Sequence, residues 1–379
     1  MKKLLYPFTL FTIAAFLAAC SGGSTETVEE TDETAEAEAT EEVSEEAAES
    51  FTIVAFSHEV DDWATWKSAY DEHKYMRDEA GLEELDVLVT FLLGHHGGAI
   101  NAILYYGSCM RNKDPFEGIV DLYLITDGYR AAYSSKFRAL LNWLLPPNVF
   151  YKELAVGERT LRVKYNVLST AALRRGLSRR SMHSYFWGRF TQPMEILWCR
   201  NDTVRSDMEA CFLLAAKTFL ERVLPAVASS GSVSDLWAQG LRLSYAAELR
   251  TESTGRAQEL VDHALQRYVA TSVSVASSLR FPLEITGVGK SARYTADVSA
   301  SSRFLGRLGW VVRRVQGKVL SVARLLKALF TFDGGLDYVA WKLERHSGQR
   351  IEIPDRVRRY PLIFVWGMLW KLYRRGIIR

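Results

Sequence analysis

A glycine-serine turn and an aspartate lie close together in this sequence, and their groups could bind a phosphate and a metal ion. Residues 104–127 read LYYGSCMRNKDPFEGIVDLYLITD, in which Gly107-Ser108 follows one apolar run and Asp121 opens a second. Glycine lets the backbone approach a triphosphate, and the serine hydroxyl and nearby N–H groups can hold phosphate oxygens. A carboxylate can hold Mg²⁺, which assists in-line attack at the α-phosphorus. These residue types favour nucleotide chemistry.

Asp121 is the only carboxylate at the start of the second apolar run. A second acid two residues later would lie about 6.5 Å away on the same face of a strand, where two acids can share a metal pair. Tyr123 occupies that position. Asp127 has the right parity but lies about 20 Å along an extended strand, so we expect it to be a loop or helix-capping residue.

The elements that must position these residues alternate between strands and helices. The sequence predicts strands over 99–106 and 120–126, a helix over 129–145 ended by Pro146-Pro147, and a hairpin over 148–169 turning at 156–158. Further on, we expect a helix over 203–224, a linker over 229–237 with a helix cap at Ser234, and a helix over 257–276. The pattern indicates an α/β (α+β) part followed by a mostly helical part.

Five segments occur in an informative order: YYGSCMR, VDLYLITD, LPPNVFYKE, LRVKYNVLS and SYFWGRFTQPMEILW. A strand, a Gly-Ser turn and an acid on the next strand resemble the core of polymerase-beta-type nucleotidyltransferases. Together the five segments resemble the mitochondrial-type phosphatidate cytidylyltransferase family, which makes CDP-diacylglycerol from CTP and phosphatidic acid. LRLSYAAELRTES also fits, and the resemblance extends over about 85–379.

The resemblance implies an architecture and a set of site residues. It implies a nucleotidyltransferase domain over 85–230 and a helical, winged-helix-like domain over 231–379 with an amphipathic C-terminus. The implied enzyme is peripheral, Mg²⁺-dependent and without transmembrane helices, with a lone acid at the position of Asp121. The implied site consists of a phosphate cradle (Tyr106, Gly107, Ser108), a catalytic metal ligand (Asp121), nucleotide contacts (Asn148, Tyr151), a charge-stabilising lysine (Lys164) and a phosphate-pairing arginine (Arg189).

The implied activity is CMP transfer from CTP to phosphatidic acid, with release of pyrophosphate. CTP, phosphatidic acid and an anionic membrane surface are the partners that this activity requires. Because aromatic and basic residues do not alternate along a strand face, we expect no nucleic-acid partner. The same fold also transfers nucleotides to proteins, antibiotics and RNA, so other acceptors stay open.

Charge and amphipathic segments fit an anionic membrane. Residues 85–379 hold 42 Lys and Arg against 24 Asp and Glu, a net charge of +18. Residues 303–329 predict a basic amphipathic helix that lies on a membrane, or, as the alternative, a core-facing helix with a solvated basic side. Residues 360–379 combine an aromatic apolar run with terminal basic residues, which is typical of an interfacial segment.

The N-terminal 84 residues have a different character. Residues 1–20 form a secretory signal pattern, and LAAC resembles a bacterial lipobox, which implies cleavage before Cys20 and acylation of its thiol. Residues 21–50 are acidic and low in complexity, which predicts a disordered linker. Residues 51–84 resemble part of a ferredoxin-like α/β domain.

The leader and the C-terminal part predict different locations. A lipobox predicts a cell-envelope lipoprotein, whereas CTP lies in the cytoplasm, where an active enzyme would bind the membrane peripherally. Three interpretations stay open: a misread gene start or fusion in front of a real enzyme, an exported non-catalytic lipoprotein that binds lipid or a partner through this fold, or a leader retained as a cytoplasmic-side anchor. We favour catalytic competence of residues 85–379 because the motifs occur in order.

Overall fold

The computed structural model describes residues 83–249 and 255–332 and, with gaps, residues 335–374. The predicted signal peptide with Cys20, the linker at 21–50 and nearly all of the segment at 51–84 lie outside the described residues. Most of the interfacial segment at 360–379 lies outside them as well. Within the described part, no helix combines the length and apolar character needed to cross a membrane.

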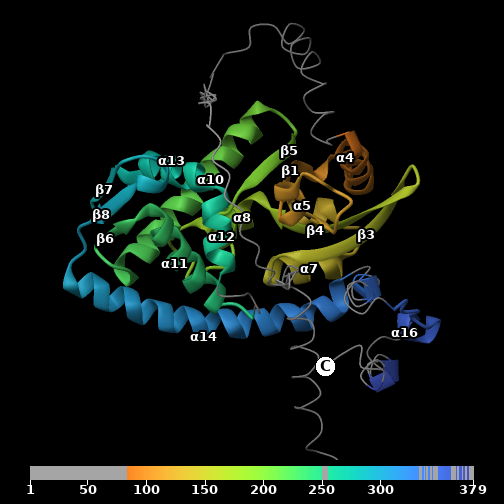
Figure 1. The fold of residues 1–379 in the computed structure, drawn as a ribbon. Coiled ribbons are helices and arrows are strands. Elements are labelled where there is room, and N and C mark those ends of the chain that lie inside the picture. Colours follow the sequence, from red (N-terminus) through yellow and green to blue (C-terminus); the bar gives the residue numbers. More distant parts are fainter. Residues whose placement is uncertain are drawn as a thin grey trace, which may run out of the picture. The chain divides into compact units, whose positions relative to one another are not determined.

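A five-stranded sheet forms the centre of the α/β part (Figure 1). Its strands lie in the order β3-β4-β2-β1-β5, and only β2 and β4 run parallel. Their bounds are β1 Ile100–Tyr106, β2 Val120–Thr126, β3 Asn148–Val156, β4 Arg159–Ser169 and β5 Met194–Cys199. The predicted strands and the hairpin are confirmed. Gly157 has a φ of 59°, which permits the tight turn between β3 and β4.

Two helices replace the single helix that we predicted over 129–145. They are α6 (Tyr129–Ala132) and α7 (Lys136–Leu144), separated by extended backbone at Tyr133 and Ser135. The Ser135 hydroxyl accepts the backbone N–H of Arg138 and so begins a new helix. The prediction of one helix was therefore wrong, because a serine cap outweighed the apolar periodicity.

The mostly helical part begins with α10 (Asp202–Val223), which confirms the predicted long helix. It continues with α11 (Val233–Ala246), α12 (Arg256–His263) and α13 (Leu265–Ala276). The single helix predicted over 257–276 was wrong, because Ala264 leaves the helical conformation (φ −125°, ψ 29°). This break lets α12 pack on α11 while α13 packs on α10.

The predicted linker over 229–237 contains a strand and the start of a helix. Residues Ser230–Ser232 form β6, which pairs with β8 (Arg293–Ala296), and β8 pairs in turn with β7 (Leu283–Thr286). The helix cap is Ser232 and not Ser234: the Ser232 hydroxyl accepts the N–H of Asp235 at 3.0 Å. Ser234 instead donates to the Asp262 carboxylate. Pairing with a distant strand was not visible in the local composition.

One hydrophobic core extends across the predicted domain boundary at residue 230. It joins Leu104 and Tyr123 of the sheet to Phe219 of α10 and Trp237 of α11. The Phe219 and Trp237 rings stack with centroids 4.9 Å apart. The remaining short helices are α4 (Glu83–His96), α5 (Ser108–Asn112), α8 (Thr170–Leu177), α9 (Trp187–Phe190) and α16 (Asp355–Arg359), of which α8 and α9 contribute to this core.

A 32-residue helix, α14 (Ala300–Thr331), runs along one edge of the described fold (Figure 1). It confirms the helix predicted over 303–329. Its inner face carries Trp310, Arg313 and Gly317, and a Cβ at Gly317 would lie 2.1 Å from the Ala247 carbonyl oxygen. Its outer face is apolar, which is the reverse of a core-facing helix with a solvated basic side. Glycine fits this close packing because it has no side chain, whereas Val311 and Val315 of the same helix face outward.

Candidate active site

Four of the predicted site residues form a row across the sheet. Tyr106 of β1 lies opposite Asp121 of β2, Asp121 opposite Lys164 of β4, and Lys164 opposite Tyr151 of β3. Residues in register point to the same face of a sheet, so the four side chains share one face. The register therefore brings together residues that are up to 58 positions apart in the sequence.

Asp121 and Lys164 form an ion pair at the centre of this row. The Lys164 Nζ lies 2.7 Å from the Asp121 Oδ1, and about one fifth of each side chain is exposed. Burial alone would lower the pKa of Lys164, but the Asp121 carboxylate outweighs it and holds that pKa above the usual value. The site thus keeps a fixed positive charge next to its carboxylate.

The glycine turn lies directly against Asp121. Gly107 has a φ of 98°, and a Cβ at this position would lie 2.9 Å from the Asp121 Oδ2. Ser108 follows as the first residue of α5. Only glycine accommodates both the backbone conformation and the close carboxylate. The turn and the acid, which are separate in the sequence, therefore form one wall of the site.

Tyr106 is held by an asparagine that we did not predict. The Asn166 amide donates to the Tyr106 hydroxyl oxygen at 3.0 Å and to the Leu122 carbonyl at 3.2 Å. Burial, followed by the nearby Asp121 charge, raises the pKa of Tyr106 well above its usual value. The phenol stays protonated at neutral pH, and because its oxygen accepts from Asn166, its own proton is available to an acceptor in the pocket.

Arg189, on the short helix α9, is fixed in two ways. Its Nη2 donates to the Glu248 Oε2 at 2.7 Å, and its guanidinium lies 4.5 Å from the centre of the Tyr185 ring. The Glu248 charge helps to hold the Arg189 pKa above its usual value despite burial. The Arg189 Nε is buried and has no hydrogen-bond partner among the described residues. One donor of this arginine therefore has no acceptor among the described residues.

A pocket of about 170 Å³ connects these groups with α14. Tyr106, Lys164, Asn166 and Arg189 line one side, and α14 supplies the opposite wall with Arg324, Lys327 and apolar residues. Four Lys and Arg side chains thus line the pocket, and Glu248 is the one acid among its described lining residues. Anionic ligands fit such a pocket, because its basic side chains outnumber Glu248 and the neighbouring Asp121.

Tyr151 and Asn148 lie away from the pocket. Tyr151 is buried, and its hydroxyl donates to Glu153 at 2.7 Å. Its ring packs on Tyr338, which also lies 5.7 Å from the Lys164 Nζ. Asn148 has the opposite parity on β3 and faces the other side of the sheet, where it donates to the Arg138 carbonyl. Sequence reasoning placed both residues near the site but could not establish which way they face.

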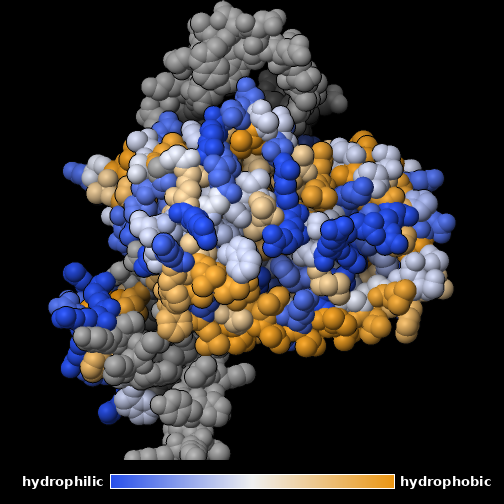
Figure 2. All heavy atoms as spheres, turned by 180° about the vertical axis from the view of Figure 1, so that it is seen from behind, coloured by the Kyte–Doolittle hydropathy of each residue, from blue (hydrophilic) through white to orange (hydrophobic). Residues whose placement is uncertain are grey.

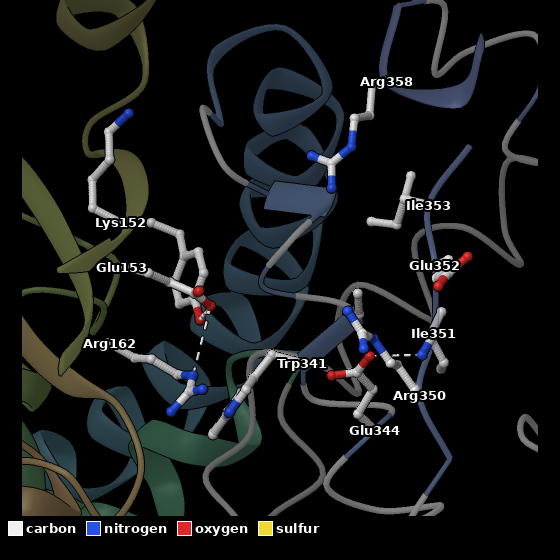
Figure 3. Close-up of a pocket in the computed structure, with 12 residues that line it drawn as sticks. Lys152, Glu153, Arg162, Trp341, Glu344, Arg350, Ile351, Glu352, Ile353 and Arg358 are labelled. Carbon is white, nitrogen blue, oxygen red and sulfur yellow. Dashed lines mark hydrogen bonds and ion pairs between the residues drawn. The ribbon is translucent and has the colours of Figure 1, made fainter. Parts of the chain in front are cut away.

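A second, wider pocket of about 790 Å³ lies beyond Tyr151 (Figure 3). Figure 3 shows Lys152, Glu153 and Arg162 of the β3–β4 hairpin on one side and Glu344, Arg350, Ile351 and Arg358 on the other. Glu153 and Arg162 pair at 3.6 Å, and the Ile351 N–H donates to Glu344 at 2.6 Å. Its described lining has four basic and three acidic side chains, so its cationic excess is smaller than that of the first pocket.

Asp127 lies outside both pockets, as expected for a loop residue. It follows β2, accepts from Asn101 at 2.7 Å and pairs with Arg200 at 2.8 Å. These two hydrogen bonds lower the Asp127 pKa. Of the two carboxylates that the sequence singled out, Asp121 alone lies beside the pocket.

A Mg²⁺ ion at this site would take most of its ligands from substrate phosphates and water. In the described residues, no three His, Cys, Asp or Glu side chains lie close enough to hold a metal by themselves. Mg²⁺ in nucleotide sites commonly uses one or two carboxylates together with substrate phosphates and water. A single carboxylate beside a glycine turn fits that mode of binding, with Asp121 as the protein ligand.

Comparisons with known proteins do not assign this chain to a family. No family model and no curated protein matches the chain. Among solved structures, the chain is similar to a nucleotidyltransferase-like protein from Exiguobacterium sibiricum, with 15% identity and a TM-score of 0.19. The match covers 75% of this chain and 89% of that chain. A TM-score this low carries no weight for the function of this chain.

The fold class that we predicted is confirmed: a mixed α/β sheet followed by a mostly helical part. A strand, a glycine turn, an acid on the antiparallel neighbour and a lysine on the next strand define the site. Sequence reasoning missed Asn166, Tyr185 and Glu248, although each lies inside a segment that carried the resemblance. It also missed the inward direction of Arg324 and Lys327.

Proposed function

We propose that this protein transfers CMP from CTP to phosphatidic acid and so produces CDP-diacylglycerol and pyrophosphate. The observation that carries the proposal is the Asp121–Lys164 pair: Asp121 lies against the Gly107 turn, and Lys164 lines a pocket with excess positive charge. Both substrates are phosphate esters, and the pocket suits them electrostatically. The five sequence segments that resemble phosphatidate cytidylyltransferases supply the choice of substrates.

The reaction is an in-line displacement that balances without a redox partner. An oxygen of the phosphatidate phosphate forms a bond to the α-phosphorus of CTP, and the bond from that phosphorus to the bridging oxygen of the β-phosphate breaks. Pyrophosphate leaves with that oxygen. Charge builds up on the α-phosphate oxygens and on the leaving group, so fixed cations lower the barrier.

Each residue of the row has a role in this scheme. Gly107 lets the backbone approach the triphosphate, and the Ser108 hydroxyl can donate to a phosphate oxygen. The Lys164 ammonium, oriented by Asp121, stabilises the developing negative charge. Tyr106 donates its phenolic proton to a phosphate oxygen. Mg²⁺, held by Asp121 when bound with CTP, would supply further neutralisation of the phosphates.

The outer face of α14 supports a lipid substrate. Its exposed apolar side chains follow helical spacing and are more than 40% exposed: Phe304, Leu305, Leu308, Val311, Val312, Val315 and Val319. Arg307, Arg314 and Lys318 are exposed along one flank. Figure 2 shows the resulting apolar band along the lower edge, where α14 runs. An apolar stripe with basic residues beside it is typical of a helix that lies in an anionic membrane interface.

Helix α7 adds a second exposed apolar surface near the pocket. Phe137, Leu140, Trp143 and Leu144 are at least half exposed. The segment that follows α7 is tied to α14, because Arg324 donates to the Pro146 carbonyl and Lys327 to the Leu145 and Pro147 carbonyls. Pro147, which lines the pocket, therefore lies close to apolar residues that can enter a bilayer.

Negative charges introduced on the apolar outer face of α14 should weaken membrane binding. We expect Leu308→Asp with Val315→Asp to weaken binding to phosphatidic acid vesicles by at least about 10²-fold, because burial of each side chain contributes about 1.5–3 kcal/mol. Co-sedimentation with vesicles measures this, using the full chain with Cys20→Ser so that no acyl anchor contributes. Stability should change little, because both side chains are exposed.

The matched control is Val273→Asp on α13, a helix at the opposite edge of the fold in Figure 1. Val273 is 57% exposed, close to the 64% of Val315. This control should bind vesicles like the unmodified chain. Equal binding by the α14 variant and the control would contradict the membrane role of α14.

A methyl group at Gly107 should damage the site. We expect Gly107→Ala to reduce pyrophosphate release by at least about tenfold, because the backbone strain costs about 1–3 kcal/mol and the new Cβ displaces the Asp121 carboxylate. Gly157→Ala is the control, since Gly157 also has a positive φ but has nothing within 4 Å of the added Cβ. Both variants should melt at a lower temperature. Retained activity in Gly107→Ala would contradict the proposed phosphate-binding role of the Gly107 turn.

A further inference from the structure

Two arginines from different parts of the fold lie on one tyrosine ring. The Arg324 guanidinium lies 4.0 Å from the centre of the Tyr185 ring, and the Arg189 guanidinium lies 4.5 Å from the same centre. Both line the pocket that contains Lys164. Stacking on an aromatic ring fixes the plane of a guanidinium without using its N–H donors. The two arginines are thus held close together with donors left for a ligand.

Arg324 differs from Lys164 and Arg189 in forming no salt bridge with an acidic side chain among the described residues. Lys164 pairs with Asp121, and Arg189 pairs with Glu248. In the described part of the chain, Arg324 forms a hydrogen bond only through its Nε, to the Pro146 carbonyl at 3.1 Å. Like charges brought together in a pocket are costly unless an anion joins them. The terminal nitrogens of Arg324 are therefore suited to an anionic ligand.

Lys327 does not play the same role. Its Nζ donates to the Leu145 carbonyl at 2.5 Å and the Pro147 carbonyl at 2.6 Å. Burial, with Arg324 adding to it, lowers the Lys327 pKa to about 7. Lys327 therefore ties the end of α7 to α14, and Arg324 carries the lasting positive charge on this wall.

The surroundings of Arg324 suit a phosphate attached to an apolar molecule. Leu249, Leu325, Ala328 and Phe332 line the pocket beside it, whereas the glycine turn that suits a triphosphate lies at the Asp121 end of the sheet row. The same helix carries the exposed apolar band on its outer face. A lipid whose head group enters the pocket would contact both a cation, Arg324, and apolar residues on the same wall.

We propose that Arg324, together with Arg189, binds the phosphate monoester of the lipid acceptor and so holds the attacking oxygen. This assignment rests on the proposed transfer to phosphatidic acid. A guanidinium matches the oxygens of a phosphate monoester in a bidentate arrangement. The sequence pattern left open whether the helix at 303–329 lies on a membrane or packs on the core, and the structure turns its Arg324 inward.

The test uses dihexanoyl phosphatidic acid, which is soluble and so separates head-group recognition from membrane docking. For Arg324→Gln in the full chain, we expect the KM for this lipid to rise about 10- to 100-fold, as for loss of a charged hydrogen bond. The KM for CTP should stay within about twofold. Titration calorimetry without CTP should show the same weakening of lipid binding. Arg242→Gln, an exposed arginine of α11, is the control and should match the unmodified chain.

Several outcomes separate this assignment from the proposed function. An unchanged KM for the lipid in a folded Arg324→Gln variant would overturn the assignment and leave the function intact. A rise in the KM for CTP alone would also overturn it, because Arg324 would then bind the nucleotide phosphates. Arg324-dependent lipid binding without turnover would support the assignment and contradict the function. Circular dichroism of each variant excludes misfolding as the cause.

Discussion

Replacing Asp121 with asparagine should reduce pyrophosphate release by on the order of 10³-fold, the largest effect that we expect from a single substitution. The amide would keep the shape of the side chain but lose the charge that pairs with Lys164 and that, in the proposed function, holds Mg²⁺. The KM for CTP in Mg²⁺ should rise as well, because the protein would lose the carboxylate that binds the metal. Initial-rate kinetics at varied CTP and Mg²⁺ concentrations measure both effects.

Asp127→Asn is the matched control for Asp121→Asn. Asp127 lies at the end of the same strand, but its partners are Asn101 and Arg200, outside the pocket. We expect its activity to stay within about twofold of the unmodified chain, as for a substitution outside a site. Equal loss of activity in both variants would mean that the strand, rather than the pocket carboxylate, is what the reaction requires.

Lys164→Met should have the second largest effect, a loss of activity on the order of 10²-fold. Methionine fills a similar volume but removes the charge that stabilises the α-phosphate and the leaving pyrophosphate. The loss should appear mainly in kcat, because the stabilised charge develops in the transition state. Single-turnover measurements with saturating CTP separate this step from product release.

Lys152→Met, on the neighbouring strand, is the control for Lys164→Met. Its parity on β3 places it on the opposite face of the sheet, in register with Val163. We expect the Lys152→Met variant to be as active as the unmodified chain. The double variant Asp121→Asn with Lys164→Met should lose less activity than the product of the two single losses, because the groups act as a pair. Fully multiplicative losses would show that the 2.7 Å pair has no joint role.

The central sheet could be predicted because its strands are continuous apolar runs bounded by turn residues. β2 and the β3–β4 hairpin agree with the predicted ranges, and buried strands leave this signal in any window of the sequence. The Gly107–Asp121 contact was also foreseeable, since a turn and the next strand must lie close together. Lys164 could be placed only through the resemblance, because its register with Asp121 depends on a parallel pairing between distant strands.

The rest of the site depends on directions that the sequence does not encode locally. Asn148 and Tyr151 lie three residues apart on one strand and so face opposite sides of the sheet, but which of them shares the face of Lys164 depends on how β3 pairs with β4. Basic residues of α14 point both outward, as Arg314 does, and inward, as Arg324 does, and periodicity alone does not show which face meets the core. The close packing at Gly317 shows which face of α14 meets the core.

The most direct test is pyrophosphate release by the purified full chain with CTP, Mg²⁺ and vesicles containing either phosphatidic acid or phosphatidylcholine alone. The proposed function predicts release only with phosphatidic acid, with an equal amount of CDP-diacylglycerol formed, and loss of both products in Asp121→Asn. Binding to phosphatidic acid vesicles without any pyrophosphate release would contradict it. That result would instead favour a lipid-binding lipoprotein that has the fold but not the activity.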